Sequence, residues 1–247
     1  MIKAKSGSKW TANELDYFNI VVSNVDRFRN FFGIEPAELP ETVRTFVNID
    51  LKRCVRQLYA ATRLNINAES SVNDFAVKVL ELCEHDDGGR TVGTRPEIDL
   101  LMTGKIKYAK PDAYVHTDND GIVLLVQEDK NWRTRSTKIR DVEAQVIAEA
   151  IAAYQYNRNK DMLAHRPEVL EQQFPCIVMF GAYPMFYLIT VTNMLSQAVA
   201  SGSKPSVPTE VKKFSIPPIE GIIGDTLYDR EKRLRIMQAY IAFKRFL

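Results

Sequence analysis

Two carboxylates and an amine lie close together around one short stretch of the chain. Asp112 follows Pro111, and Glu128 and Lys130 stand two residues apart further along. Like charges on neighbouring strands repel one another unless a cation lies between them. Carboxylate oxygens favour Mg²⁺ or Mn²⁺, which retain waters that they can acidify or orient. These residues predict a site where Asp112 and Glu128 bind a divalent cation and Lys130 orients a water or stabilises negative charge.

A predicted β-hairpin would position these groups. Residues 113–117 and 122–127 are rich in β-branched and aromatic side chains, and the sequence DNDG between them tolerates turn conformations. Pairing outward from this turn places Asp112 opposite Gln127 or Glu128. Alternate residues of a strand share one face, so we expect the two acids and the amine to converge there.

The motif resembles the PD-(D/E)XK nuclease superfamily, which has the restriction-endonuclease-like fold. Pro111-Asp112 and then Glu128-Asp129-Lys130 carry the resemblance, which covers residues 70–192. The segments QEDK and EAQVIAEAIAAYQYN are also similar to a group of uncharacterised fungal proteins that we place in this superfamily. The resemblance implies an α/β core of a helix, an antiparallel three-strand meander, a helix and further strands. It also implies a nuclease that uses Mg²⁺ or Mn²⁺ to hydrolyse phosphodiester bonds of DNA or RNA.

The helix before the sheet is a source of a third acid. In the superfamily an acid from this helix often completes the metal shell, and the resemblance implies Glu81, with Glu69 and Glu84 as alternatives. An acid on a polar helix face is also commonly just solvated. The apolar stripe that would face the sheet comprises Val72, Phe75, Val79, Leu80 and Cys83.

The helix after the hairpin is predicted over residues 142–156, with Asp141 as its N-cap and many alanines that allow close approach to a sheet. Several branches of the superfamily place a supporting glutamine there, which implies Gln145. Glu143 and Glu149 are its rivals or surface residues.

Further acids and a basic cluster flank the hairpin. Glu97 and Asp99 share one face of a predicted first strand over residues 90–102, interrupted near Pro96, and either could approach the metal. The sequence NWRTRSTKIR follows Lys130; it would bind phosphates and stack on an unpaired base, or form an exposed soluble loop. Its nucleic-acid-binding candidates are Trp132, Arg133, Arg135, Lys138 and Arg140.

The composition limits the classes of protein to which this chain can belong. The 247 residues are 45% hydrophobic and 26% charged, as in an ordinary globular protein. No apolar run suits a membrane span or a secretory signal, so we expect an intracellular protein, cytoplasmic or nuclear. A net charge of +2 supports a nucleic-acid partner only weakly. The widely spaced Cys54, Cys83 and Cys176 are interpreted as buried thiols.

Three regions are predicted along the chain. Residues 1–69 form an N-terminal helical addition, whose first helix includes Leu15 through Phe28. Residues 70–195 form the core, with a polar stretch over 157–173 and further strands over 176–180 and 185–192. Residues 196–247 form a loop and a helix that packs on the core.

Two alternatives to a nuclease remain at this point. The chain could be a catalytically inactive nuclease-fold protein that binds nucleic acid or protein. The acids could instead pair with arginines in a structural network. The sequence leaves open the oligomeric state, and whether DNA or RNA is the partner.

Overall fold

A seven-stranded mixed sheet forms the centre of the molecule, in a computed structural model that describes residues 2–40, 56, 68–119, 121–128, 139–217 and 229–247. The helical elements are η1 (Gly7–Lys9), α1 (Ala12–Tyr17), α2 (Phe28–Phe32), η2 (Pro36–Glu38), α5 (Ala68–Leu82), α6 (Ile139–Leu163), α7 (Asn193–Ser201), α8 (Arg230–Phe243) and η5 (Lys244–Phe246). The strands are β1 (Ile20–Asn24), β2 (Arg90–Thr94), β3 (Ile98–Met102), β4 (Lys105–Ala109), β5 (Ala113–Thr117), β6 (Ile122–Glu128), β7 (Glu171–Phe180), β8 (Tyr183–Thr192) and β9 (Thr209–Ser215).

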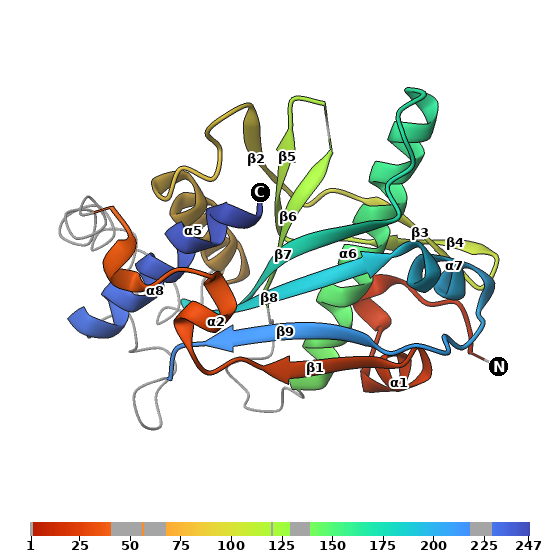
Figure 1. Ribbon diagram of the computed structural model, residues 1–247, viewed down its shortest axis with the longest axis horizontal. Coiled ribbons are helices and arrows are strands. Elements are labelled where there is room, and N and C mark those ends of the chain that lie inside the picture. The colour runs from red at the N-terminus through yellow and green to blue at the C-terminus, as the bar shows by residue number, and fades with distance from the viewer. Residues whose placement is uncertain (1, 41–55, 57–67, 120, 129–138, 218–228) are drawn as a thin grey trace.

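The strand order is β1-β9-β8-β7-β6-β5-β2, as Figure 1 shows. Two neighbouring pairs are parallel, β1 with β9 and β6 with β7, and the other neighbours are antiparallel. The chain therefore has a mixed α/β fold. Along the sequence, α5 precedes the antiparallel meander β2-β5-β6, and α6 then crosses over to β7.

The sheet separates two hydrophobic clusters. One cluster contains residues of α1, α6 and α7, and the other contains residues of α2, α5 and α8. In β6, Leu125 belongs to the α6 side, whereas Leu124 and Val126 belong to the α5 side. This alternation is the period-2 pattern of a strand that is buried on both faces.

The predicted hairpin of residues 113–117 and 122–127 is confirmed as β5 and β6. The predicted first strand over 90–102 is instead two strands in different sheets. β2 lies at the edge of the large sheet, and β3 leaves it to pair with β4. The chain changes direction at Arg95, which has φ 49°, and at Pro96, which has no N–H to donate to a ladder. Thr103 and Gly104 then form the β3–β4 turn with φ 49° and 70°.

The expectation of one long first helix is wrong. α1 ends at Tyr17, Asn19 takes φ 55°, and β1 follows. β1 pairs in parallel with β9, a strand that the sequence did not predict. The N-terminal segment is therefore not only a helical addition, because it contributes an edge strand to the central sheet.

α6 begins and ends beyond its predicted limits. It runs from Ile139 to Leu163, so the beginning of the stretch expected to be polar is helical. Asp141 lies inside the helix and its carboxylate accepts a hydrogen bond from the N–H of Ala12 (2.9 Å). This hydrogen bond holds the N-terminal segment against the first turn of α6.

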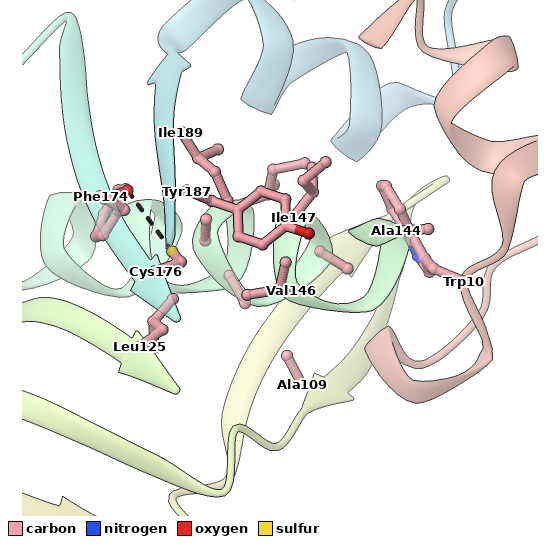
Figure 2. Close-up of a cluster of buried hydrophobic side chains, with 14 of the residues drawn as sticks. Trp10, Ala109, Leu125, Ala144, Val146, Ile147, Phe174, Cys176, Tyr187 and Ile189 are labelled. Atoms are coloured by element: carbon pink, nitrogen blue, oxygen red, sulfur yellow. Dashed lines mark hydrogen bonds between the residues drawn. The ribbon is translucent and has the colours of Figure 1, made fainter. Parts of the chain in front are cut away.

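Small residues allow this segment to lie close to α6. A Cβ added to Gly7 would be 3.2 Å from the Cβ of Ala109 and 3.6 Å from that of Ala148. Trp10 lies beside Ala144 in Figure 2 and is fully buried. The alanines of α6 therefore permit close packing, as the sequence predicted.

Cys83 and Cys176 are buried free thiols, as expected, and Cys54 lies outside the described residues. Among the helices of the described ranges, none is long and apolar enough to cross a membrane.

Candidate metal centre at the β5–β6 hairpin

Asp112 lies directly before β5 and is held by main-chain hydrogen bonds. Its N–H donates to the carbonyl of Val126 (2.9 Å), the residue with which Ala113 pairs. The N–H of Arg95 donates to the carbonyl of Asp112 (3.1 Å). The main chain of Asp112 is therefore fixed from two sides, and its side chain is half-buried.

The register of the β5–β6 ladder next to Asp112 is one of the two that were expected. Ala113 pairs with Val126, and continuing this register by one residue brings Asp112 opposite Gln127. On the other side of β6, Gln127 and Glu128 pair with Val178 and Met179 of β7. The main chain of Glu128 therefore lies within the sheet, two residues beyond Val126.

Several predicted site residues lie outside the described part of the chain. They are Lys130, the side chain of Glu128, and four members of the basic cluster, Trp132, Arg133, Arg135 and Lys138. The fifth member, Arg140, is exposed and its guanidinium donates to the carboxylate of Asp16 (2.6 Å). This ion pair adds to the contacts between α6 and α1.

The acids expected from the helix before the sheet form surface ion pairs. Glu81 is exposed and accepts from the ammonium of Lys78 (3.0 Å). Glu84 accepts from Lys244 of η5 (3.2 Å). The side chain of Glu69 lies outside the described residues. The carboxylates of Glu81 and Glu84 are therefore both engaged by lysines, and neither contact supports a role at the metal.

The acids of the predicted first strand also lie at the surface. Glu97 is exposed and forms an ion pair with Lys110. Asp99 is exposed on β3, in the small sheet, and pairs with Tyr108 of β4. Neither observation supports a role at the metal for these two residues.

The interpretation of Glu143 and Glu149 as surface residues is wrong, because both are buried, at 3% and 2% exposed. Glu143 accepts from the ammonium of Lys213 on β9 (2.8 Å) and from the hydroxyl of Tyr187 on β8 (3.3 Å). Burial, together with the nearby Glu143 charge, raises the pKa of Tyr187. Glu143 is therefore part of a structural ion pair between helix and sheet. Gln145, one turn before Glu149, is half-buried.

Glu149 has a different environment. Its Oε2 atom has no hydrogen-bond partner among the described residues. Burial raises the pKa of Glu149 well above its ordinary value, and the negative charge of Asp112 raises it further. Burial likewise raises the pKa of the Cys176 thiol, to which the Glu149 charge also contributes. The carboxyl group of Glu149 thus lies within electrostatic reach of both Asp112 and Cys176.

The described residues supply two carboxylates at this position, Asp112 and Glu149. Within the described ranges, no three His, Cys, Asp or Glu side chains form a metal-binding group. A pair of carboxylates nevertheless suits Mg²⁺ or Mn²⁺, which commonly bind one or two carboxylates together with waters and substrate phosphates. A buried carboxylate oxygen with no partner is the type of group that a cation would satisfy.

The sequence around Glu149 indicates that this residue is buried. Alanines surround it on nearly every side of the helix, at positions 144, 148, 150, 152 and 153. Such a helix is buried over most of its circumference, so an acid within it cannot be assumed to reach solvent. No protein-family model matches the chain, and no curated protein matches it significantly.

Proposed function

We propose that the protein is a metal-dependent nuclease that hydrolyses phosphodiester bonds of DNA or RNA. Asp112 and Glu128 bind Mg²⁺ or Mn²⁺, and Lys130 positions the attacking water. The order of elements around Asp112 carries this proposal. A helix, the antiparallel strands β2, β5 and β6, a crossover helix and the parallel strand β7 occur in this order, as the resemblance to the PD-(D/E)XK superfamily implies, with the β3–β4 hairpin inserted between β2 and β5.

The fixed main chain of Asp112 adds support, because a ligand on a rigid main chain is placed more precisely. Hydrogen bonds of 2.9 Å and 3.1 Å hold this main chain on both sides. The half-buried position of Asp112 leaves it accessible to a substrate phosphate.

Each residue has a defined task in the proposed reaction. A bound Mg²⁺ or Mn²⁺ supplies Lewis acidity and lowers the pKa of a coordinated water. Asp112 and Glu128 hold the ion, and Lys130 orients the water and stabilises negative charge that develops on the phosphate. Gln145 assists from the first turns of α6. The surface ion pair of Glu81 with Lys78 gives no support to a metal-binding role for Glu81.

The segment that carries Trp132, Arg133, Arg135 and Lys138 is the proposed contact with nucleic acid. Lysine and arginine bind phosphates without regard to sequence, and an indole stacks on an unpaired base. Arg140 would have to exchange its ion pair with Asp16 for a phosphate. Its contribution is therefore expected to be smaller than that of the other basic residues.

Cleavage assays test this function. The protein is incubated with single- and double-stranded DNA and RNA in Mn²⁺, beside the variants Asp112→Asn, Lys130→Ala and Asp99→Asn. We expect the first two variants to lose cleavage by about 100-fold or more, since each removes a group that acts on the reacting centre. Asp99→Asn removes an exposed acid of β3 and should cleave at the wild-type rate.

Wild-type rates in Asp112→Asn or Lys130→Ala would contradict the assignment of the site. Absence of cleavage by the wild-type protein, together with retained binding of nucleic acid, would favour a binding module that keeps the fold without turnover.

A further inference from the structure

We propose that Glu149 of α6 joins Asp112 in binding the divalent cation, so that the acid supplied by a helix comes from the helix after the hairpin. This inference rests on the metal site of the proposed function and names a ligand of that site. Three observations support it. They are the position of Glu149 along α6, the burial of its side chain, and the lysine partners that the other buried acids have.

The position of Glu149 follows from an anchor at the far end of the helix. Asn157 hydrogen-bonds to both main-chain groups of Ile122, at the start of β6 (2.8 Å and 2.7 Å). Because β7 runs parallel to β6, the intervening α6 runs back along both strands. Eight helical residues from Asn157 to Glu149 rise about 12 Å. Four strand residues from Ile122 to Val126 span about 13 Å. Glu149 is therefore level with Val126, whose carbonyl accepts a hydrogen bond from the N–H of Asp112.

Contacts on the same face agree with this placement. Leu125 of β6, Cys176 of β7 and Ala148 of α6 belong to one buried cluster, and Leu125 pairs with Cys176 in the ladder. Figure 2 shows Leu125 and Cys176 side by side, with α6 next to them. The charge of Asp112 raises the pKa of Glu149, and that of Glu149 raises the pKa of Cys176, in agreement with the level given by the anchor at Asn157.

Glu149 differs from the other buried acids of the described chain, Glu14 and Glu143. Glu14 accepts from the ammonium of Lys5 (2.7 Å), and Glu143 accepts from that of Lys213 (2.8 Å). Each of these carboxylates has a lysine partner that compensates for its lost hydration. Glu149 has no such ion pair among the described residues, and its Oε2 is without a hydrogen bond there. A buried carboxylate is costly unless a cation or a proton compensates it.

The neighbouring groups favour a hard cation. The Cys176 thiol is fully buried and donates to the carbonyl of Phe174 (3.6 Å), and burial raises its pKa. A protonated thiol is a poor ligand for the soft metals that bind thiolates. The oxygen atoms of Asp112 and Glu149 instead suit Mg²⁺ or Mn²⁺, with waters in the remaining positions.

Calorimetric titration of the full chain with Mn²⁺ alone tests the proposal. The variants are Glu149→Gln, Asp112→Asn and Glu143→Gln, with circular dichroism to show that each is folded. We expect the first two to lower Mn²⁺ affinity by at least about tenfold, as loss of a group that binds or orients a metal commonly does. Glu143→Gln changes a buried acid of the same helix that is paired with Lys213, and it should bind Mn²⁺ within about twofold of the wild type.

Glu149→Asp provides a second variant that retains a carboxylate on a shorter side chain. We expect it to bind Mn²⁺ more weakly than the wild type and more tightly than Glu149→Gln. Wild-type affinity in Glu149→Gln, or no binding of millimolar Mn²⁺ by the wild-type chain, would overturn the proposal. Loss of Mn²⁺ binding in Glu149→Gln from a chain that cleaves no nucleic acid would keep the cation site and reject the nuclease.

Discussion

Asn157 of α6 hydrogen-bonds to both main-chain groups of Ile122, the first residue of β6. The Oδ1 atom accepts from the Ile122 N–H (2.8 Å), and Nδ2 donates to the Ile122 carbonyl (2.7 Å) and to Oε1 of Gln172 (3.0 Å). Ile122 pairs with His116 just where the β5–β6 register shifts. The side-chain amide of Asn157 therefore holds this end of the β5–β6 hairpin against α6, the helix that covers it.

Asn157→Ala tests whether this amide fixes the helix on the sheet. The change removes the Asn157 hydrogen bonds to both main-chain groups of Ile122, and the carbonyl keeps the longer hydrogen bond from Nε2 of Gln172 (3.5 Å). We expect the free energy of unfolding to fall by about 2 to 3 kcal/mol. Urea denaturation measures the difference. Asn159→Ala replaces an exposed asparagine of the same helix and should change stability by less than about 0.5 kcal/mol. Equal effects of the two variants would contradict the role of Asn157.

The environment of His85 predicts that the folded protein loses stability in acid. It is fully buried, its Nε2 contacts the Tyr240 carbonyl (3.0 Å), and its Nδ1 has no partner among the described residues. Burial lowers the pKa of His85 to about 3, and the charges of Lys244 and Arg90 act in the same direction. A lowered folded-state pKa means that the unfolded chain binds the proton more readily. The stabilisation is complete above the unfolded pKa near 6.5 and is lost as pH falls from there towards 3.

His85→Gln isolates this effect. Between pH 7 and pH 4 we expect the wild type to lose roughly 3 kcal/mol relative to the variant, at about 1.4 kcal/mol per pKa unit. Urea denaturation at several pH values measures the difference. His165→Gln changes an exposed histidine and should follow the wild-type curve. Parallel curves for the wild type and His85→Gln would show that His85 is not the acid-sensitive group.

Gly93 and Tyr114 form a second testable pair. They face each other in the β2–β5 ladder, and a Cβ added to Gly93 would lie 2.4 Å from the Tyr114 ring. Gly93→Ala should therefore cost about 1 to 2 kcal/mol, because the ring must leave its place beside His116. In a Tyr114→Leu background the same change should be neutral or stabilising by up to about 1 kcal/mol. Equal costs in both backgrounds would rule out the contact.

The ion pair between Lys213 and Glu143 links β9 to α6. Their side chains are 16% and 4% exposed, so among the described residues Lys213→Met leaves the buried carboxylate with the Tyr187 hydroxyl as its donor. We expect a loss of about 3 kcal/mol in thermal or urea unfolding. Lys212→Met, at the exposed neighbouring position, is the matched control and should be nearly neutral. A loss below about 0.5 kcal/mol for Lys213→Met would show that the pair is not stabilising.

The residue types along the sequence were sufficient to predict the β5–β6 hairpin. β-Branched and aromatic runs on both sides of a turn-forming sequence predicted β5 and β6 to within one residue. The apolar stripe of α5 was also predicted, and Val72, Phe75, Val79, Leu80 and Cys83 are all buried. These features depend on residues near one another in the chain. Such features can be predicted directly from strand alternation and helix periodicity.

The tertiary structure alone decided which distant segments meet. The pairing of β1 with β9 joins residues 20–24 to residues 209–213, and the β5–β6 register shifts between Val115 and His116. A single polar residue carries no local sign that it will be buried, so Glu143 and Glu149 resembled surface acids. Their burial is set by how α6 lies on the sheet. That placement depends on packing between elements far apart in the sequence, and in particular on Asn157 and Ile122.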